Sequence, residues 1–122
     1  MKWITRERPK IDRIACPWLV ARFIDPEPEF LYVPGDQVMA IAAATGAIPY
    51  DVPGVELTHV GERCSFDAFI EKYQLAEPAL QRMAAIVRGA DTSRLDLTPQ
   101  SAGLHAISLG LSQIHADDHE ML

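Results

Sequence analysis

Cysteine is scarce in this chain, which has only two among its 122 residues, Cys16 and Cys64. Two thiols far apart in the sequence do not provide the disulfide framework of small secreted domains. The first residues lead directly into charged positions rather than into an apolar segment, so we expect no secretory leader. We therefore expect a cytoplasmic protein whose two cysteines are reduced.

Long hydrophobic runs and cofactor motifs are also missing. No apolar stretch approaches the roughly 20 residues that span a bilayer, so we expect no membrane segment. There is no GxGxxG, Walker or GxSxG pattern, so no sequence motif supports a nucleotide cofactor or an esterase-type nucleophile. The net charge of −6 argues against direct nucleic-acid binding. These absences favour one globular domain over residues 1–122.

The hydrophobic pattern predicts more helix than strand. Hydrophobic residues make up 48% of the chain and charged residues 23%, which is ordinary for a globular domain. Turn residues separate short segments with period-two and helical patterns. We expect strands over 3–5, 29–33, 47–52 and 55–59, and helices over 17–25, 37–45, 65–73, 78–88 and 100–116. The fold class predicted is α+β, a helix-rich single domain with a small sheet.

Two helix boundaries depend on proline and glycine. A proline inside a helix costs about 3 kcal/mol, so we expect the first helix to begin at Pro17 with Cys16 as its N-cap. There the helix dipole and the nearby Arg13 would lower the pKa of the thiol. Gly89 is expected to end the helix that begins near Pro78.

The last helix is expected to present one apolar face to the core. A helical wheel places Leu104, Ile107, Leu111 and Ile114 on that face. A neighbouring stripe at the edge of the core comprises His105, Ser108, Ser112 and His115. This stripe is interpreted either as satisfied structural groups or as the lining of a functional cleft.

A transition-metal site is the first functional hypothesis from the residues. A short loop before a helix carries His59, Glu62 and Cys64, which offer imidazole, carboxylate and thiolate ligands. Further carboxylate and imidazole groups follow later in the chain. The predicted metal ligands are His59, Glu62, Asp91, Asp118 and His119. Such a mixed site suits Fe, Zn or Mn, while the structural interpretation is a solvated turn beside a small buried thiol.

Two other kinds of chemistry are compatible with the residues. Cys64 and Cys16 are the candidate catalytic nucleophiles, because a thiol enzyme needs a thiolate near a base. Arg6, Arg8 and Arg13 lie close to an expected helix start, an arrangement that binds tetrahedral oxyanions. The alternative for these arginines is a solvated charged arm.

Five segments together resemble a known family. They read RERPKIDRIACPWL (6–19), FLYVP (30–34), FDAF (66–69), IVRGADT (86–92) and ADDHEML (116–122). With these motifs the chain resembles the C-terminal domain of the ChrB chromate-resistance proteins. The resemblance implies a role in the chromate response, with chromate or a related oxyanion as partner. It also implies an adjoining N-terminal regulatory or rhodanese-like domain, and relatives that continue beyond Leu122.

Three functions are consistent with these observations. The first is a chromate-resistance-associated binding or sensing domain with a transition-metal site. The second is a metal- or thiol-dependent oxidoreductase or sulfur-transfer enzyme that acts on an oxyanion or a persulfide. The third is a structural interaction domain for the adjoining region. The residues leave open whether any reaction is catalysed.

Overall fold

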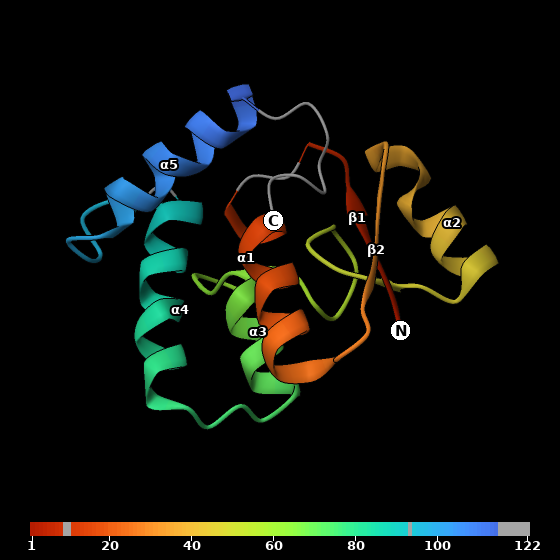
Figure 1. The fold of residues 1–122 in the computed structure, drawn as a ribbon, viewed down its shortest axis with the longest axis horizontal. Coiled ribbons are helices and arrows are strands. Elements are labelled where there is room, and N and C mark those ends of the chain that lie inside the picture. The colour runs from red at the N-terminus through yellow and green to blue at the C-terminus, as the bar shows by residue number, and fades with distance from the viewer. Residues whose placement is uncertain (9–10, 93, 115–122) are drawn as a thin grey trace.

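A computed structural model describes residues 1–8, 11–92 and 94–114 of the chain (Figure 1). It confirms the α+β fold class, with helices dominating a small sheet. The strands and helices are β1 (Lys2–Arg6), α1 (Ile11–Leu19), β2 (Glu29–Val33), α2 (Val38–Thr45), β3 (Ile48–Pro49), α3 (Ser65–Lys72), α4 (Pro78–Asp91) and α5 (Ser101–Ile114). A π-helical segment (Val20–Ile24) follows α1, and a 3-10 turn (Gly35–Gln37) precedes α2. No helix in these ranges has the length and apolar character needed to cross a bilayer.

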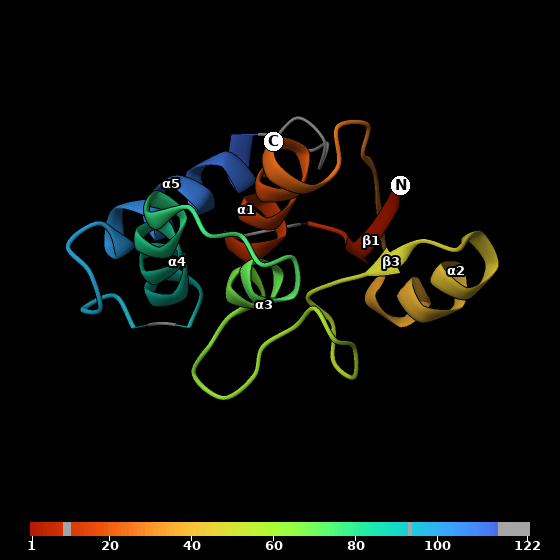
Figure 2. The ribbon, with the colours of Figure 1, turned by 90° about the horizontal axis from the view of Figure 1, so that it is seen from below.

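The sheet is parallel throughout and has the strand order β2-β1-β3. The chain leaves β1 through α1 to reach β2 and returns through α2 to β3, on the other edge of β1. Figures 1 and 2 show α2 on one side of the sheet and α1 with α3 on the other. The connections therefore diverge between β1 and β3. In open parallel sheets, ligands bind at the carboxyl ends of the strands where the connections diverge.

Alternation along β1 builds a core on each side of the sheet. Trp3 faces the larger helical side, where its ring lies 5.8 Å from that of Phe69 in α3. Ile4 faces the opposite side and packs in a smaller cluster with Val38 of α2. Both β1 side chains are fully buried, as expected for a central strand covered on both faces.

The first helix differs from the prediction. It begins at Ile11 rather than at Pro17, and it contains the proline in its interior. Pro17 removes one backbone donor, and three residues later the helix widens into the π-helical segment. Cys16 therefore lies in mid-helix and is fully buried. The predicted N-cap position of this thiol was wrong, and the dipole argument for a lowered pKa no longer applies.

The stretch before α3 is a loop rather than a strand. Residues 55–59 were expected to alternate as a strand, but they form only a single bridge between Leu57 and Tyr50. β3 is likewise limited to Ile48 and Pro49. Because proline has no N–H, Pro49 prevents regular pairing at this edge.

The contact between α4 and α5 also differs from the prediction. α4 continues through Gly89 to Asp91, so the glycine does not end the helix. Instead, Gly89 allows α5 to approach, because a side chain at this position would collide with Ser101. Ser101 and Ser108 are the buried residues of α5, while Ile107 is 63% exposed. Leu104 of the predicted apolar face packs against the larger core, whereas Ile107 and Ile114 do not, so that prediction was wrong for these two residues.

Candidate functional site

His59 lies between two carboxylates that the fold brings from distant segments. Its Nε2 atom is 2.8 Å from Oδ2 of Asp91, at the end of α4. It is also 3.5 Å from Oδ1 of Asp51, which lies two residues after the end of β3. The sequence predicted His59 and Asp91 as members of one site, and the structure places them side by side.

Asp51 organises this cluster, which we call the His59 cluster and define as Arg6, Asp51, His59, Ser65 and Asp91. The Ser65 hydroxyl donates a hydrogen bond of 2.8 Å to Oδ1 of Asp51. Arg6, at the end of β1, donates to the Asp51 carbonyl at 3.0 Å and lies 3.6 Å from its carboxylate. Asp51 itself has a left-handed backbone, with φ of 53°. This conformation turns the chain away from the sheet while its side chain stays buried.

The His59 cluster is at the carboxyl ends of β1 and β3, where the connections of the sheet diverge. A hollow of about 370 Å³ opens there, lined by Arg6, Asp51, Thr58, His59 and the turn at 52–54. The site therefore occupies the usual ligand-binding position of a parallel sheet. Its two carboxylates and single guanidinium give it a slightly negative character that favours a cation.

Among the described residues, none of the other predicted metal ligands joins this cluster. Glu62 lines a different pocket, described below. Asp118 and His119 lie outside the described residues. Within 1–8, 11–92 and 94–114, no group of three or more His, Cys, Asp and Glu side chains could hold a metal ion. The predicted five-ligand site thus reduces, in the described part of the chain, to the pair His59 and Asp91.

An ion pair between the partly exposed Arg88 and the buried carboxylate of Asp67 joins α4 to α3. Arg88 of α4 donates from Nη2 and Nε to the two carboxylate oxygens of Asp67, at 2.7 and 3.0 Å. The same carboxylate accepts the Cys64 backbone N–H at 3.0 Å and so caps the start of α3. Burial acts to raise the pKa of Asp67, but the hydrogen bonds from Arg88 and Cys64 outweigh it and leave the pKa lowered.

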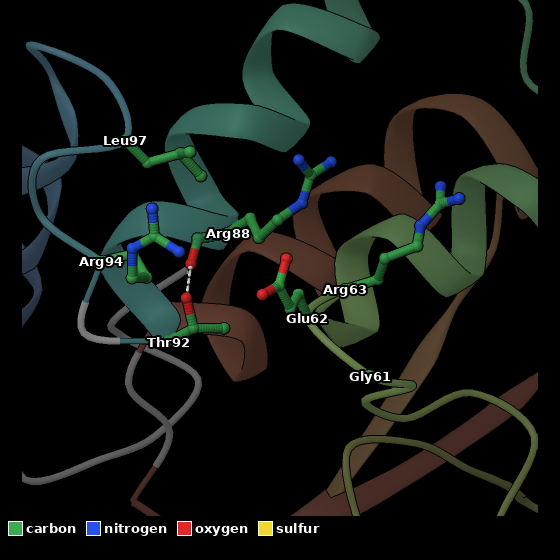
Figure 3. A pocket seen from close by; sticks show the side chains of 7 residues that line it. All are labelled: Gly61, Glu62, Arg63, Arg88, Thr92, Arg94 and Leu97. Carbon is green, nitrogen blue, oxygen red and sulfur yellow. Dashed lines mark hydrogen bonds between the residues drawn. The ribbon is translucent and has the colours of Figure 1, made fainter.

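Arg88 also belongs to a pocket lined by three arginines, which we call the arginine pocket (Figure 3). Its volume is about 390 Å³, and its lining consists of Gly61, Glu62, Arg63, Arg88, Thr92, Arg94 and Leu97. The three guanidinium groups come from the loop before α3, from α4 and from the segment after α4 (Figure 3). This pocket is the most cationic of the hollows described here.

Two of these arginines are only loosely held. Arg63 lies 4.0 Å from Asp67 and 3.9 Å from Glu71, and Arg94 lies 3.5 Å from Asp96. Both arginines are about half exposed. Because such surface pairs contribute little, these guanidinium groups are available to an incoming anion.

Two of the predicted anion-binding arginines, Arg6 and Arg8, do not line this pocket. Arg6 is engaged by Asp51 at the end of β1. Arg8 donates to the Ser112 carbonyl of α5 at 2.5 Å. The side chain of Arg13 is outside the part that the structure describes. Their role in binding an oxyanion stays a prediction, whereas Arg63, Arg88 and Arg94 are brought together by the fold.

Comparison with known proteins gives one clear result. The model of the family described as "ChrB, C-terminal domain" matches residues 3–122. The chain belongs to this family. Protein ChrB of Cupriavidus metallidurans is 29% identical over 122 residues, which are 99% of this chain but 36% of that relative. No solved structure matches the chain.

The thiols of this ChrB C-terminal domain are both in the core. Cys16 and Cys64 form no disulfide in the structure, and both are fully buried. The Cys64 sulfur is 3.4 Å from Oδ2 of Asp67, within the cap of α3. A reactive thiol needs access to its substrate, so this burial does not favour Cys64 or Cys16 as nucleophiles.

The sequence did not reveal several residues of these sites. Asp51 was read as part of an edge strand, and Asp67 only as a charge in the first turn of a helix. The arginine pocket was missed because its three arginines lie in three different segments. One available signal was the spacing of Asp67 in the first turn of α3, which is typical of a reciprocal cap.

Proposed function

We propose that this chain is the oxyanion-binding domain of a chromate-response protein, and that the arginine pocket is where the anion binds. The observation that carries the proposal is that Arg63, Arg88 and Arg94, from three segments of the chain, line one open pocket. Planar guanidinium groups donate paired hydrogen bonds to the oxygens of chromate, phosphate or sulfate. The family membership supports chromate as the physiological anion.

The geometry favours anion binding for a second reason. Asp67 uses the Nε and Nη2 groups of Arg88, which fixes the guanidinium plane and leaves its remaining N–H groups for a ligand. Arg88 is thus oriented before the anion arrives, whereas Arg63 and Arg94 can close on it from their loosely paired positions. Preorganisation of one donor reduces the ordering cost of binding.

The test is chromate titration of the purified protein by calorimetry at low salt. Arg63→Gln and Arg94→Gln should each weaken chromate binding by roughly 10-fold, which corresponds to one lost charge-assisted contact. Arg82→Gln is the matched control, since Arg82 is exposed on α4 and does not line the pocket. It should bind chromate like the unaltered protein.

Two outcomes would count against this function. One is a failure of the unaltered protein to bind chromate, phosphate or sulfate at millimolar concentration. The other is equal chromate affinity in the Arg63→Gln/Arg94→Gln double variant and in Arg82→Gln. Thermal unfolding of each variant verifies that the fold is retained, which is expected because both arginines are about half exposed.

A transition-metal ion at the His59 cluster is the second candidate. It is favoured by the approach of His59 to both Asp91 and Asp51 at the carboxyl ends of the sheet. Imidazole and carboxylate groups together suit Zn, Fe or Mn. Of the other predicted ligands, Glu62 lines a different pocket, and Asp118 and His119 lie outside the described residues. The proposal therefore takes His59 and Asp91 as two ligands and keeps Asp118 and His119 as the predicted others.

Elemental analysis of protein purified without an affinity tag tests this candidate. We expect about one metal ion per chain in the unaltered protein and in His105→Ala, a control on α5, and its loss in His59→Ala. Metal-free protein after supplementation with Zn, Fe and Mn would refute the site. Equal metal content in His59→Ala and His105→Ala would refute it as well.

The adjoining region of the protein is also a proposal. The chain spans 36% of the ChrB relative, so that relative has a further region of about twice this length. We propose that this domain passes the state of its anion site to such a region. The structural-domain and enzyme alternatives remain predictions, and the burial of both thiols does not favour the latter.

A further inference from the structure

The arginine pocket also contains a carboxylate, although a negative charge does not favour the binding of an anion. Glu62 lines the pocket with the three arginines, in the tight turn between Val60 and Arg63 (Figure 3). Gly61 precedes it with φ of 61°, a left-handed conformation that favours glycine and sets the direction of the turn. A negative group at this position opposes the binding of any anion, so its presence calls for a chemical role.

Glu62 does not neutralise the arginines around it. In the described residues, none of the ion pairs involves Glu62. The carboxylate that pairs with Arg88 is that of Asp67, which is only 2% exposed. The two acidic groups therefore differ in their tasks. Asp67 orients Arg88 within the protein, whereas the exposed Glu62 faces whatever occupies the pocket.

We propose that Glu62 is the specificity determinant of the pocket and selects an oxyanion that carries a proton. This inference rests on the proposed function, because it assumes that an oxyanion binds there. An ionised carboxylate has acceptors but no donor. It gains a strong hydrogen bond from the O–H of hydrogen chromate or hydrogen phosphate.

A fully deprotonated anion cannot donate this hydrogen bond to Glu62. Sulfate has no proton to donate near neutral pH, so its oxygens face the Glu62 carboxylate without a hydrogen bond and with repulsion. Chromate and sulfate have the same tetrahedral shape and the same charge when deprotonated. They differ in basicity, since chromate takes up a proton just below neutral pH, whereas sulfate does so only in strong acid. A carboxylate in the pocket therefore discriminates between two anions that shape and charge alone cannot separate.

The experiment compares the binding of chromate, inorganic phosphate and sulfate to the full chain at pH 7 by calorimetry. The variant is Glu62→Gln, and the matched control is Glu29→Gln, which removes the same charge from an exposed position on β2. The unaltered protein and the control should prefer chromate and phosphate over sulfate by roughly 10- to 100-fold. In Glu62→Gln this preference should shrink at least 10-fold, chiefly through tighter sulfate binding.

The outcomes separate this inference from the function on which it rests. If both proteins bind oxyanions but Glu62→Gln keeps the original preference, Glu62 is not the determinant and the oxyanion function stands. A variant that loses all oxyanions while the unaltered protein binds them also overturns the inference, because sulfate binding is expected to improve. If neither protein binds any of the three anions, the proposed function itself fails.

Discussion

Substitution of Gly89 by alanine tests the packing of α4 against α5. In most helix interiors this change stabilises a protein by about 0.5–1 kcal/mol, because glycine pays a larger entropic cost than alanine. Here the added Cβ would fall inside van der Waals contact with Ser101 Oγ and 2.8 Å from the Arg94 carbonyl oxygen. Ser101 has little room to move, since its hydroxyl donates to the Ile86 carbonyl at 3.1 Å.

The magnitude follows from these two opposing effects. Forcing a methyl group into a packed contact costs about 1–3 kcal/mol, and a backbone neighbour places this site at the upper end. After subtraction of the helix-propensity gain, we expect a net loss of about 2 kcal/mol in the free energy of unfolding. For a domain of this size such a loss lowers Tm by about 8 °C.

Urea and thermal unfolding followed by circular dichroism measure this effect, with Gly103→Ala as the control. Gly103 lies in α5, on the other side of this contact, but a Cβ there would meet nothing within 4 Å, so this variant should gain about 0.5–1 kcal/mol. Because Arg94 lines the arginine pocket, Gly89→Ala should also weaken chromate binding, whereas Gly103→Ala should not. A Gly89→Ala protein as stable as Gly103→Ala would refute the close approach of the two helices.

Two further predictions concern the ion pair between Asp67 and Arg88 and the exposed face of α5. The pKa of Asp67 is lowered in the folded state. The stability that this carboxylate contributes is therefore fully present above its pKa in the unfolded chain, about 3.9, and is lost as the pH falls through its lower pKa in the folded state. Asp67→Asn should therefore be less stable than the unaltered protein at neutral pH, and its stability should depend less on pH below about 4. Acid titrations of both proteins followed by circular dichroism measure this difference. Parallel stability curves for the two proteins would contradict it. Ile107→Gln should change the free energy of unfolding by less than about 0.5 kcal/mol, because Ile107 is 63% exposed. Val87→Ala, at a buried position, should lower the free energy of unfolding by more than about 1 kcal/mol in urea. A larger loss in Ile107→Gln than in Val87→Ala would support the helical-wheel prediction instead.

Short-range chemistry in the sequence determined many of the elements. The β-rich stretch at 29–33 is the strand that was predicted. Gly46 ends α2 with φ of 74°, as expected for a helix C-cap. Pro78 occupies the first turn of α4, where its missing N–H is no loss. Each of these features depends on residues within one or two turns of one another, so the sequence was sufficient to predict them.

Local rules failed where tertiary contacts outweighed them. Pro17 remains inside α1 because the packing of this helix in the larger core, through Cys16 and Leu19, compensates for its lost hydrogen bond. Gly89 serves the approach of α5 rather than a helix end. Ser101 and Ser108 are buried in place of the larger Ile107, since small side chains allow the two helices to pack closely. Propensity could not predict these choices, because each depends on a neighbour that is distant in the sequence.

The candidate sites also depend partly on local sequence and partly on tertiary contacts. The sequence by itself determined the family, the α+β class and the chemical types available, including His59 and Asp91 as possible partners. Only the tertiary structure decided which groups meet. It joined Asp51 to His59 at the end of the sheet and gathered Arg63, Arg88 and Arg94 around Glu62. Loops and helix ends carry these side chains, and the relative positions of such segments are set by packing of the core beneath them rather than by any local pattern.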